Sequence, residues 1–422
     1  MIPYERERSL DHANRVIRDC VQRRGWTLET EDMGGHLITV KCTLRDAGGE
    51  LISRGFGKGE AAVSLTGALY EAMEHHYCKF AHTATPVQYL PAERIAQDPR
   101  NAGLPFLSAF ADNAGRAIAC RSYRSYSGGE ALAVPLFLTF PEYPVAAAPD
   151  ARDDFDYGSV TRFSSNSGTA IGASFEEAAL HGIAEIVERD AWSLFLIAHY
   201  LAGAGRYGRL IEPASLPEEA ARVHRLAERR LGRRVLLIEI TSDLGLPVFI
   251  ATTEQRLPGE VVFPHGCGAS PYPQYAAIRA LSELTQCVDI KESSGHLAEL
   301  DQLALDMLAD YPKLRDCAMF RIDPERLERV EWPHPDKPRL APKQLLPVLV
   351  RELESRGIGL YHAINHREGE DFCVVSSVSP ELERFFLATT GILMAPGRRG
   401  SEFLRRQREA AAEREPLLAQ EA

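Results

Sequence analysis

Three stretches of the chain combine the hydrophobic spacing of an α-helix with glutamates that lie among apolar residues. They are residues 68–74 (ALYEAME), 182–190 (GIAEIVERD) and 278–286 (IRALSELTQ). In the first two stretches the glutamates lie three residues apart, so they share one helix face. A carboxylate on a buried face is costly unless a cation or a hydrogen bond compensates its charge. Several such carboxylates brought together repel one another unless a divalent cation lies between them. The pattern therefore predicts a metal site.

The same patterning predicts a mixture of helices and strands along the whole chain. Helices are predicted over residues 9–25, 60–81, 174–200, 215–233, 273–291, 341–356 and 380–390. Strands are predicted within residues 36–54, as a hairpin that turns at 46–49, and over 117–123, 131–140, 234–242, 246–253, 358–364 and 371–377. Helices and strands mix without a clean boundary, which indicates an α/β fold with mixed sheets.

A loop of small residues is predicted before each glutamate helix. Loop and helix together occupy residues 55–78, 164–190 and 266–287. Intervals of roughly 100 residues are too long and irregular for a solenoid of stacked repeats. We therefore expect internal pseudo-symmetry around one site. After Pro396 the chain is charged and Ala-rich, and a frayed helix or a disordered end is expected there.

Composition and charge mainly exclude functional classes. A chain of 422 residues with 45% hydrophobic and 25% charged residues has the composition of a soluble globular protein. Its formal net charge of -11 argues against a general nucleic-acid binder. No apolar run is long enough for a membrane span, and the charged N-terminus lacks the apolar core of a signal peptide. The eight cysteines are scattered without a CxxC pair, as in reduced cytoplasmic proteins, so we expect a cytoplasmic location.

Residues in and around the three glutamate helices resemble the three ATP-site blocks of the YcaO family. The blocks lie within residues 57–74, 165–191 and 266–286. The resemblance implies a YcaO-type ATP-binding fold over residues 51–395, preceded by a helix and hairpin at 1–50 and followed by a charged tail at 396–422. Members of the family use ATP to activate peptide backbone amides. Most make azolines from Cys, Ser or Thr of precursor peptides, and others make thioamides or amidines.

The resemblance also implies ATP and Mg²⁺ as cofactors and assigns roles to particular residues. Arg189 and Arg279 would contact phosphate oxygens and act in catalysis, a role suited to the guanidinium fork. Glu177 precedes Glu188 by about three helical turns and so shares its face, which makes it a further candidate for cofactor binding. The remaining cofactor-binding candidates are Lys58 and Asn166, and the magnesium ligands would be Glu71, Glu74, Glu185, Glu188 and Glu283.

Each of these residues has an ordinary interpretation when taken alone. Glu71 and Glu74 would form a solvated helix face, and residues 55–59 would be the end of a Gly-rich hairpin, since they do not match a phosphate-binding loop. Asn166 would be a turn residue or a helix cap. Only the joint occurrence of the three blocks indicates the metal site.

The sequence departs from the family pattern at Gly67, where a serine is common, and at His75, where an arginine is common. It also lacks the Pro-x-Pro-x-Pro ending of azoline-forming members. We expect cyclodehydration of Cys, Ser or Thr in a ribosomally synthesised precursor peptide, with thioamide or amidine formation as the first alternative. The second alternative is a degenerate ATP-binding scaffold that presents a peptide to another enzyme. It is motivated by Gly67 and His75, whereas the retained glutamates oppose it. The resemblance implies a separate E1-like or TfuA-like partner that recognises the precursor, and leaves a homodimer open.

Overall fold

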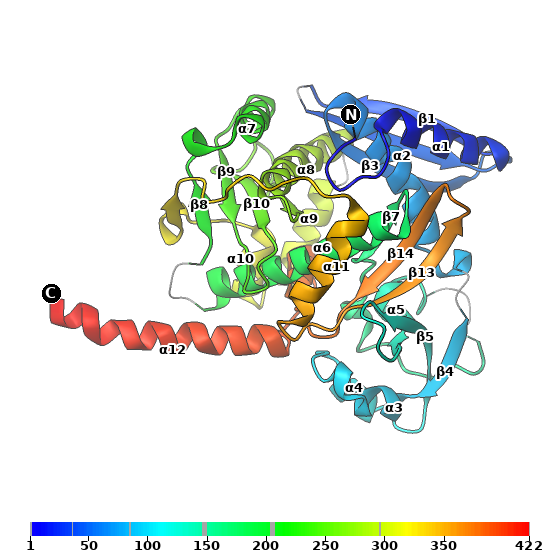
Figure 1. Ribbon diagram of the computed structural model, residues 1–422. Helices are drawn as coiled ribbons and strands as arrows, with labels where there is room; N and C mark the ends of the chain where they lie inside the picture. Colours follow the sequence, from blue (N-terminus) through cyan, green and yellow to red (C-terminus); the bar gives the residue numbers. More distant parts are fainter. Residues whose placement is uncertain are drawn as a thin grey trace. The chain divides into compact units, whose positions relative to one another are not determined.

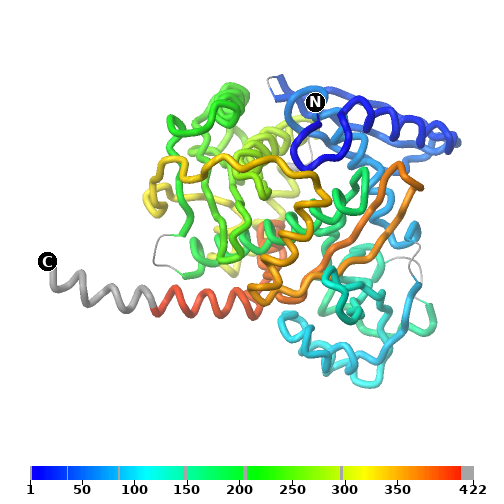
Figure 2. Tube along the Cα trace, viewed as in Figure 1, coloured from blue at the N-terminus to red at the C-terminus, as the bar shows by residue number. Residues whose placement is uncertain are grey.

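The computed structural model describes residues 2–35, 37–83, 86–145, 150–202, 207–294 and 297–421. Met1, His36 and Ala422, which belong to the predicted terminal regions, lie outside the described residues. The chain divides into two compact units, and the path through each can be followed by colour in Figures 1 and 2. Unit 1 comprises Met1–Ile186 and Lys337–Glu381, and unit 2 comprises Val187–Asp336 and Leu382–Ala422.

Unit 1 begins with a helix, an antiparallel sheet and a second helix. In chain order these are α1 (Leu10–Arg23), β1 (Thr27–Met33), β2 (Ile38–Arg45), β3 (Leu51–Gly59) and α2 (Ala61–Tyr77). The strand order is β1-β2-β3, and α2 packs on β3 and on α1. The Ser9 side chain accepts a hydrogen bond from the His12 N–H and so caps the start of α1. Buried apolar residues of α1, the sheet and α2 form one shared core.

A second sheet of unit 1 has, among the described residues, the order β4-β5-β13-β14-β7 with β6 paired to β5. Its strands are β4 (Val87–Pro91), β5 (Ala117–Ser125), β6 (Leu132–Pro135), β7 (Thr169–Gly172), β13 (Tyr361–Glu368) and β14 (Phe372–Val378). The helices of this part are α3 (Ala92–Gln97), α4 (Leu107–Ala111), α5 (Leu136–Thr139) and α11 (Pro342–Glu354). An aromatic-rich core that includes Phe106, Phe110 and Phe137 fills the space between β5, β6 and the short helices.

The long helix α6 (Phe175–Leu196) continues from unit 1 into unit 2 and ends in a π-helical turn, Ile197–Leu201. The sheet of unit 2 has the order β11-β10-β9-β8-β12. Its strands are β8 (Arg209–Ile211), β9 (Val235–Glu239), β10 (Val248–Thr253), β11 (His265–Ala269) and β12 (Glu328–Val330). Its helices are α7 (Glu218–Leu231), α8 (Pro273–Ser293), α9 (Leu297–Met307), α10 (Pro312–Met319) and α12 (Arg398–Glu421). Helix α8 packs on β11, β10 and α7.

One arrangement, a helix followed by three antiparallel strands and a second helix, occurs in both units as α1-β1-β2-β3-α2 and as α7-β9-β10-β11-α8. Glycines of β3 and β11 lie at equivalent places in it. A Cβ atom on Gly55 would lie 2.2 Å from the backbone nitrogen of Ala72, and a Cβ atom on Gly266 would lie 2.2 Å from that of Leu284. The repeat confirms the expected internal pseudo-symmetry for the first and third of the three blocks, and the second block, which contains β7 and α6, lies outside it.

Several sequence predictions of local structure are wrong. Residues 55–59 and the first residues of 266–270 are not loops but belong to β3 and β11. Glycine recurs in these strands because a helix backbone approaches them directly, which only a residue without a side chain allows. The predicted helix over 380–390 is instead a set of turns with a 3₁₀-helix at Phe385–Thr390. The charged tail is helical from Arg398. Within the described residues, no helix combines the length and hydropathy of a membrane span.

Candidate functional site

Helix α2 carries the first two predicted magnesium ligands in unit 1. Glu71 and Glu74 lie one turn apart on this helix, and both are partly buried. The backbone N–H of Ile171, in β7, donates a hydrogen bond of 2.8 Å to the Glu74 carboxylate. Glu71 also lies 3.6 Å from the His75 ring nitrogen. His75 therefore sits beside the carboxylates, at the position where the family pattern usually has an arginine.

Glu185, on α6, is positioned by the loop that precedes β7. Its carboxylate accepts a hydrogen bond of 3.1 Å from the Gly168 N–H. Gly168 has a φ of +89°, and a Cβ atom there would lie 2.2 Å from the carbonyl oxygen of Ser377. The Ser377 N–H in turn donates to the Gly168 carbonyl at 2.8 Å. Gly168 is therefore required both by its backbone conformation and by the close approach of β14.

The carboxylates of unit 1 act on one another. Burial raises the pKa of Glu74 well above its ordinary value, and the negative charges of Glu71 and Glu185 raise this pKa further. The Ile171 hydrogen bond opposes the shift without reversing it. These three side chains, predicted from separate parts of the sequence, therefore lie within electrostatic range of one another. A divalent cation would relieve their mutual repulsion.

In unit 2 the remaining part of α6 carries Glu188 and Arg189. Glu188 is only 3% exposed, and its carboxylate lies 3.2 Å from the Arg189 guanidinium. The guanidinium also lies 5.3 Å from the centre of the Trp192 ring and 5.5 Å from that of Phe386. Two aromatic rings and an ion pair therefore contact the Arg189 guanidinium.

Helix α8 contributes Arg279 and Glu283, which lie one turn apart and are both partly buried. The neighbouring strand β11 carries Cys267, a residue that the sequence analysis does not single out. Burial raises the pKa of the Cys267 thiol, and the charges of Glu188 and Glu283 raise it further, while Arg189 lowers it. Glu188, Arg189 and Glu283 therefore lie close to the same point of β11. Because its thiol stays protonated, Cys267 is suited to packing rather than to nucleophilic attack.

Lys58 lies in a β-strand, whereas Asn166 lies in a turn. Lys58 is a strand residue of β3, paired with Thr39 of β2, and is partly buried. Asn166 is exposed in the turn before β7, where its carbonyl accepts the Thr169 N–H. The Asn166 amide nitrogen lies 4.0 Å from the sulfur of Cys78, whose pKa burial and the charge of Glu74 raise. Asn166 therefore lies near the unit 1 carboxylates.

Glu177 is 4% exposed and binds the N-terminal segment. Its carboxylate accepts hydrogen bonds from the Arg6 guanidinium at 3.1 Å and from the Glu7 N–H at 3.0 Å. The Arg6 charge also lowers the pKa of Glu74, although burial dominates that pKa. Sequence reasoning misses Arg6 because 171 residues separate it from Glu177 and no local motif marks it.

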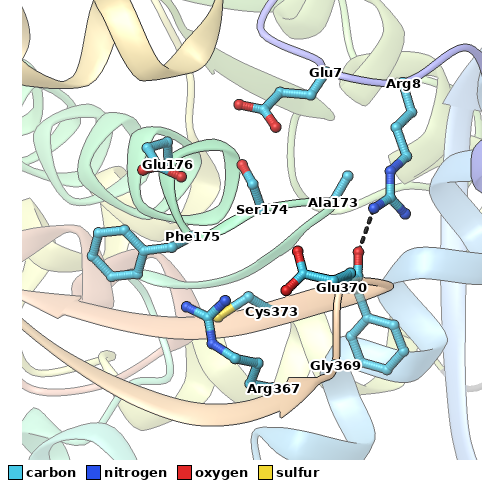
Figure 3. A pocket seen from close by; sticks show the side chains of 11 residues that line it. Glu7, Arg8, Ala173, Ser174, Phe175, Glu176, Arg367, Gly369, Glu370 and Cys373 are labelled. Carbon is cyan, nitrogen blue, oxygen red and sulfur yellow. Dashed lines mark hydrogen bonds between the residues drawn. The ribbon is translucent and has the colours of Figure 1, made fainter.

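A polar cavity of about 390 Å³ opens beside the first turn of α6, as Figure 3 shows. Cationic and anionic side chains both line it, including Arg8, Arg367, Glu176 and Glu370. Arg8 donates hydrogen bonds to the carbonyl oxygens of Asp371 and Glu370. The cavity is therefore bordered by the same N-terminal segment that binds Glu177.

The donor set fits the expected metal. The predicted ligands are all carboxylates, and oxygen ligands are those that Mg²⁺ prefers. Across the part of the chain that the structure describes, no three His, Cys, Asp or Glu side chains already have the arrangement of a metal site. The negative charges of Glu71 and Glu185 nevertheless act on Glu74, and hydrogen bonds orient Glu74 and Glu185. This environment suits a cation better than an apolar ligand.

Comparison with known proteins identifies related sequences and folds. A family model described as "YcaO cyclodehydratase, ATP- and Mg²⁺-binding" matches residues 56–383. This match confirms the resemblance and the two expected cofactors, ATP and Mg²⁺. A protein of Rhizobium leguminosarum bv. trifolii, described as an uncharacterized protein in the tfuA 3′ region, is 30% identical over 246 residues. The match covers 54% of this chain and 53% of that protein, so the chain spans about half the length of this curated relative.

Solved structures share the fold at low sequence identity. The YcaO structure from Methanopyrus kandleri bound with AMPPCP and Mg²⁺ matches with a TM-score of 0.63 at 19% identity, over 94% of this chain and 98% of that one. A heterocyclase in complex with substrate and cofactor matches with a TM-score of 0.61 at 17% identity, over 90% of this chain and 54% of that one. These matches confirm the predicted α/β fold with mixed sheets.

Proposed function

Because this chain belongs to the YcaO family, we propose that it uses ATP and Mg²⁺ to activate backbone amides of a peptide by O-phosphorylation. When bound, Mg²⁺ would neutralise negative charge that develops on ATP during phosphoryl transfer. In this proposal the carboxylates hold the magnesium, and Arg189 and Arg279 hold phosphate oxygens through their guanidinium forks. The magnesium ligands are Glu71, Glu74, Glu185, Glu188 and Glu283.

The equivalence of Glu71 and Glu283 carries the proposal. A Cβ atom on Gly55 would lie 2.7 Å from the carbonyl carbon of Glu71, and one on Gly266 would lie 2.7 Å from that of Glu283. Each copy of the repeated strand–helix motif therefore presents a glutamate at the same helical position. A structural role in one motif would not require the same acidic residue at the same place in the other.

The product we propose is an azoline ring. The side-chain sulfur or oxygen of a substrate Cys, Ser or Thr attacks the preceding carbonyl carbon and forms a new C–S or C–O bond. The carbonyl oxygen takes the γ-phosphoryl group, so that ATP becomes ADP, and this oxygen then departs as phosphate. The side chain loses its S–H or O–H proton and the amide nitrogen loses its proton as the C=N bond forms, so the peptide has lost one water in all. The enzyme contributes positioning and charge stabilisation. The likeness to a solved heterocyclase supports this version.

A second candidate product is a thioamide, in which sulfur from an external donor replaces the carbonyl oxygen. The relative at 30% identity supports it, because that protein is described by its position in the tfuA 3′ region. In this version the separate partner that recognises the precursor peptide is TfuA-like.

Mass spectrometry of candidate precursor peptides, incubated with the protein, ATP and Mg²⁺, distinguishes the two products. Loss of one water from the peptide indicates cyclodehydration, and exchange of oxygen for sulfur in the presence of a sulfide donor indicates thioamide formation. Reactions without Mg²⁺ and with the Glu188→Gln variant are the controls. Magnesium-dependent ATP binding with no change in the mass of any tested peptide, with or without partner, would favour the scaffold alternative.

A further inference from the structure

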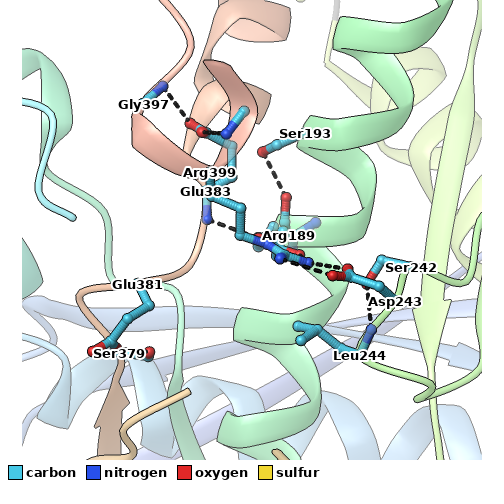
Figure 4. A network of polar contacts seen from close by, with 12 residues as sticks. Arg189, Ser193, Ser242, Asp243, Leu244, Ser379, Glu381, Glu383, Gly397 and Arg399 are labelled. Atoms are coloured by element: carbon cyan, nitrogen blue, oxygen red, sulfur yellow. Dashed lines mark hydrogen bonds and ion pairs between the residues drawn. The ribbon is translucent and has the colours of Figure 1, made fainter. Parts of the chain in front are cut away.

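Arg399, in the first turn of α12, binds a buried carboxylate of α6. Its Nε donates to Asp190 Oδ1 at 2.7 Å and its Nη2 donates to Asp190 Oδ2 at 3.0 Å, which is a two-bond fork. Asp190 is fully buried, and the Arg399 side chain is 18% exposed. Arg399 also binds Asp243, in the loop after β9. Figure 4 shows this network, with Arg399 and Asp243 labelled. A buried carboxylate with such a partner is held much more firmly than a surface ion pair.

Glu383 holds the start of α12 in place. Its buried carboxylate accepts hydrogen bonds from the Gly397 N–H at 3.1 Å and the Gly400 N–H at 2.7 Å. A Cβ atom on Gly400 would lie 2.5 Å from the Glu383 carboxylate and 2.6 Å from Ile197. Because Gly397 and Gly400 have no side chains, the first turn of α12 can approach the Glu383 carboxylate closely. Arg399 lies between these two glycines in the sequence.

The same stretch of chain also contacts Arg189. The Glu383 N–H donates to Asp190 at 2.9 Å, and the Phe386 N–H donates to the Ser193 hydroxyl at 2.9 Å. The Ser193 hydroxyl in turn donates to the Arg189 carbonyl at 2.7 Å. The Phe386 ring lies against the Arg189 guanidinium. The contacts of residues 383–400 therefore converge on the turn of α6 that carries Arg189.

We propose that Arg399 is a positioning residue for Arg189. Arg399 holds Asp190, and Asp190 also accepts the Glu383 N–H, three residues before Phe386. Arg399 therefore fixes both the turn of α6 that carries Arg189 and the Phe386 ring that contacts the Arg189 guanidinium. That Arg189 then binds nucleotide phosphates rests on the proposed function. In this proposal the first residues of the C-terminal helix support nucleotide binding, and Arg399 acts through Asp190 rather than by direct contact with nucleotide or metal.

The test compares Arg399→Met with Arg405→Met, a matched change at an exposed arginine of the same helix that pairs only with Glu409 among the described contacts. Affinity for Mg–AMPPCP is measured by calorimetry, and folding is checked by thermal melting. Arg399→Met is expected to weaken nucleotide binding about tenfold, and Arg405→Met by less than about twofold. Arg399→Lys keeps the charge but loses the fork and is expected to give an intermediate affinity.

Two further readouts separate positioning from general stability. In an Arg189→Lys background, Arg399→Met should weaken the affinity for Mg–AMPPCP by less than a further factor of about two, because the residue through which Arg399 acts is already lost. Fully additive effects would overturn the proposal. Asp190→Asn combined with Arg399→Met removes both buried charges and serves as the variant that still folds if Arg399→Met does not. This double variant should bind nucleotide more weakly than the wild-type protein, and an affinity equal to that of the wild-type protein would also overturn the proposal.

The fluorescence of Trp192 tests the contact without nucleotide. The chain has three tryptophans, so a protein with Trp26→Phe and Trp332→Phe keeps Trp192, beside Arg189, as its sole tryptophan. Arg399→Met should change the Trp192 emission and Arg405→Met should not. Should the wild-type protein fail to bind Mg–AMPPCP, the proposed function fails, while an altered Trp192 emission still supports the positioning of Arg189. Unchanged emission in folded Arg399→Met overturns the inference.

Discussion

A Cβ atom on Gly266 would lie 2.5 Å from the carbonyl oxygen of Ala280, so β11 and α8 touch through their backbones. Glu283 lies one turn further along the same helix, and its position therefore depends on this contact. The glycine is required by the helix that it faces rather than by a turn.

Gly266→Ala should destabilise the protein by about 1–3 kcal/mol, because the added methyl group meets backbone atoms that cannot rotate away. Urea denaturation measures this change. Gly129→Ala is the control, since its Cβ atom would meet its nearest neighbour, Ser125, at an ordinary 3.5 Å. Equal stability of the Gly266→Ala and wild-type proteins would contradict the contact.

ATP affinity should depend on magnesium, and Glu188→Gln should abolish turnover while the fold stays intact. Glutamine keeps the shape of this buried side chain but removes a charged metal ligand. Calorimetry with and without a chelator, together with phosphate release, measures both effects. Glu325→Gln, at an exposed position of unit 2, is the control. Wild-type affinity for ATP that the chelator leaves unchanged would refute the metal assignment.

Arg279→Lys should lower phosphate release from ATP in the presence of peptide by at least about tenfold, or roughly 1.4 kcal/mol of transition-state stabilisation. Lysine cannot reproduce two parallel hydrogen bonds to a phosphate. Arg189→Lys should behave similarly, and it additionally replaces the guanidinium that lies over the Trp192 and Phe386 rings. Steady-state phosphate release is the measurement. Near-normal release from both variants would make these arginines structural residues.

Truncation after Gly400 should preserve magnesium-dependent ATP binding, because Arg399 and its contacts with Asp190 remain. Truncation before Pro396 should weaken that binding, since it removes Arg399 and the N–H groups that bind Glu383. Calorimetry on both shortened proteins tests the difference, and any loss in the longer one is expected in partner docking or solubility. If that protein binds its partner normally but cannot modify a validated peptide, the helical tail belongs to the active site.

Glu368 should make the stability of the protein depend on pH in acid. A hydrogen-bonded Arg24 guanidinium lowers the pKa of the Glu368 carboxyl to about 2, with contacts of 2.6 and 3.2 Å. Because the folded-state pKa is depressed, the stabilisation is present above the unfolded pKa and is lost as the pH falls towards the folded pKa. Glu368→Gln should cost about 1–2 kcal/mol at neutral pH, because solvent screens this partly exposed pair, and much less near pH 2. Denaturation curves at both pH values measure it, and an equal cost at both would contradict the ion pair.

The local sequence determines the elements that carry the candidate site. Hydrophobic spacing predicts the glutamate helices at 60–81, 174–200 and 273–291, and the structure has α2, α6 and α8 there. A turn at 46–49 likewise predicts the hairpin of β2 and β3. These features follow from residues a few positions apart, where helix and turn geometry leave few alternatives. The resemblance to YcaO proteins depends on the same short blocks.

Only the tertiary structure decides which distant residues meet these helices. Glycine-rich segments read as loops because glycine favours turns, yet Gly55 and Gly266 lie in strands where a helix backbone approaches. Arg6 meets Glu177 across 171 residues of sequence, and Arg399 meets Asp190 across 209. A buried carboxylate requires a partner, but its charge acts through space and does not specify where in the sequence that partner lies. The local sequence therefore determines where the acidic helices form, whereas the tertiary structure determines which arginines contact their carboxylates.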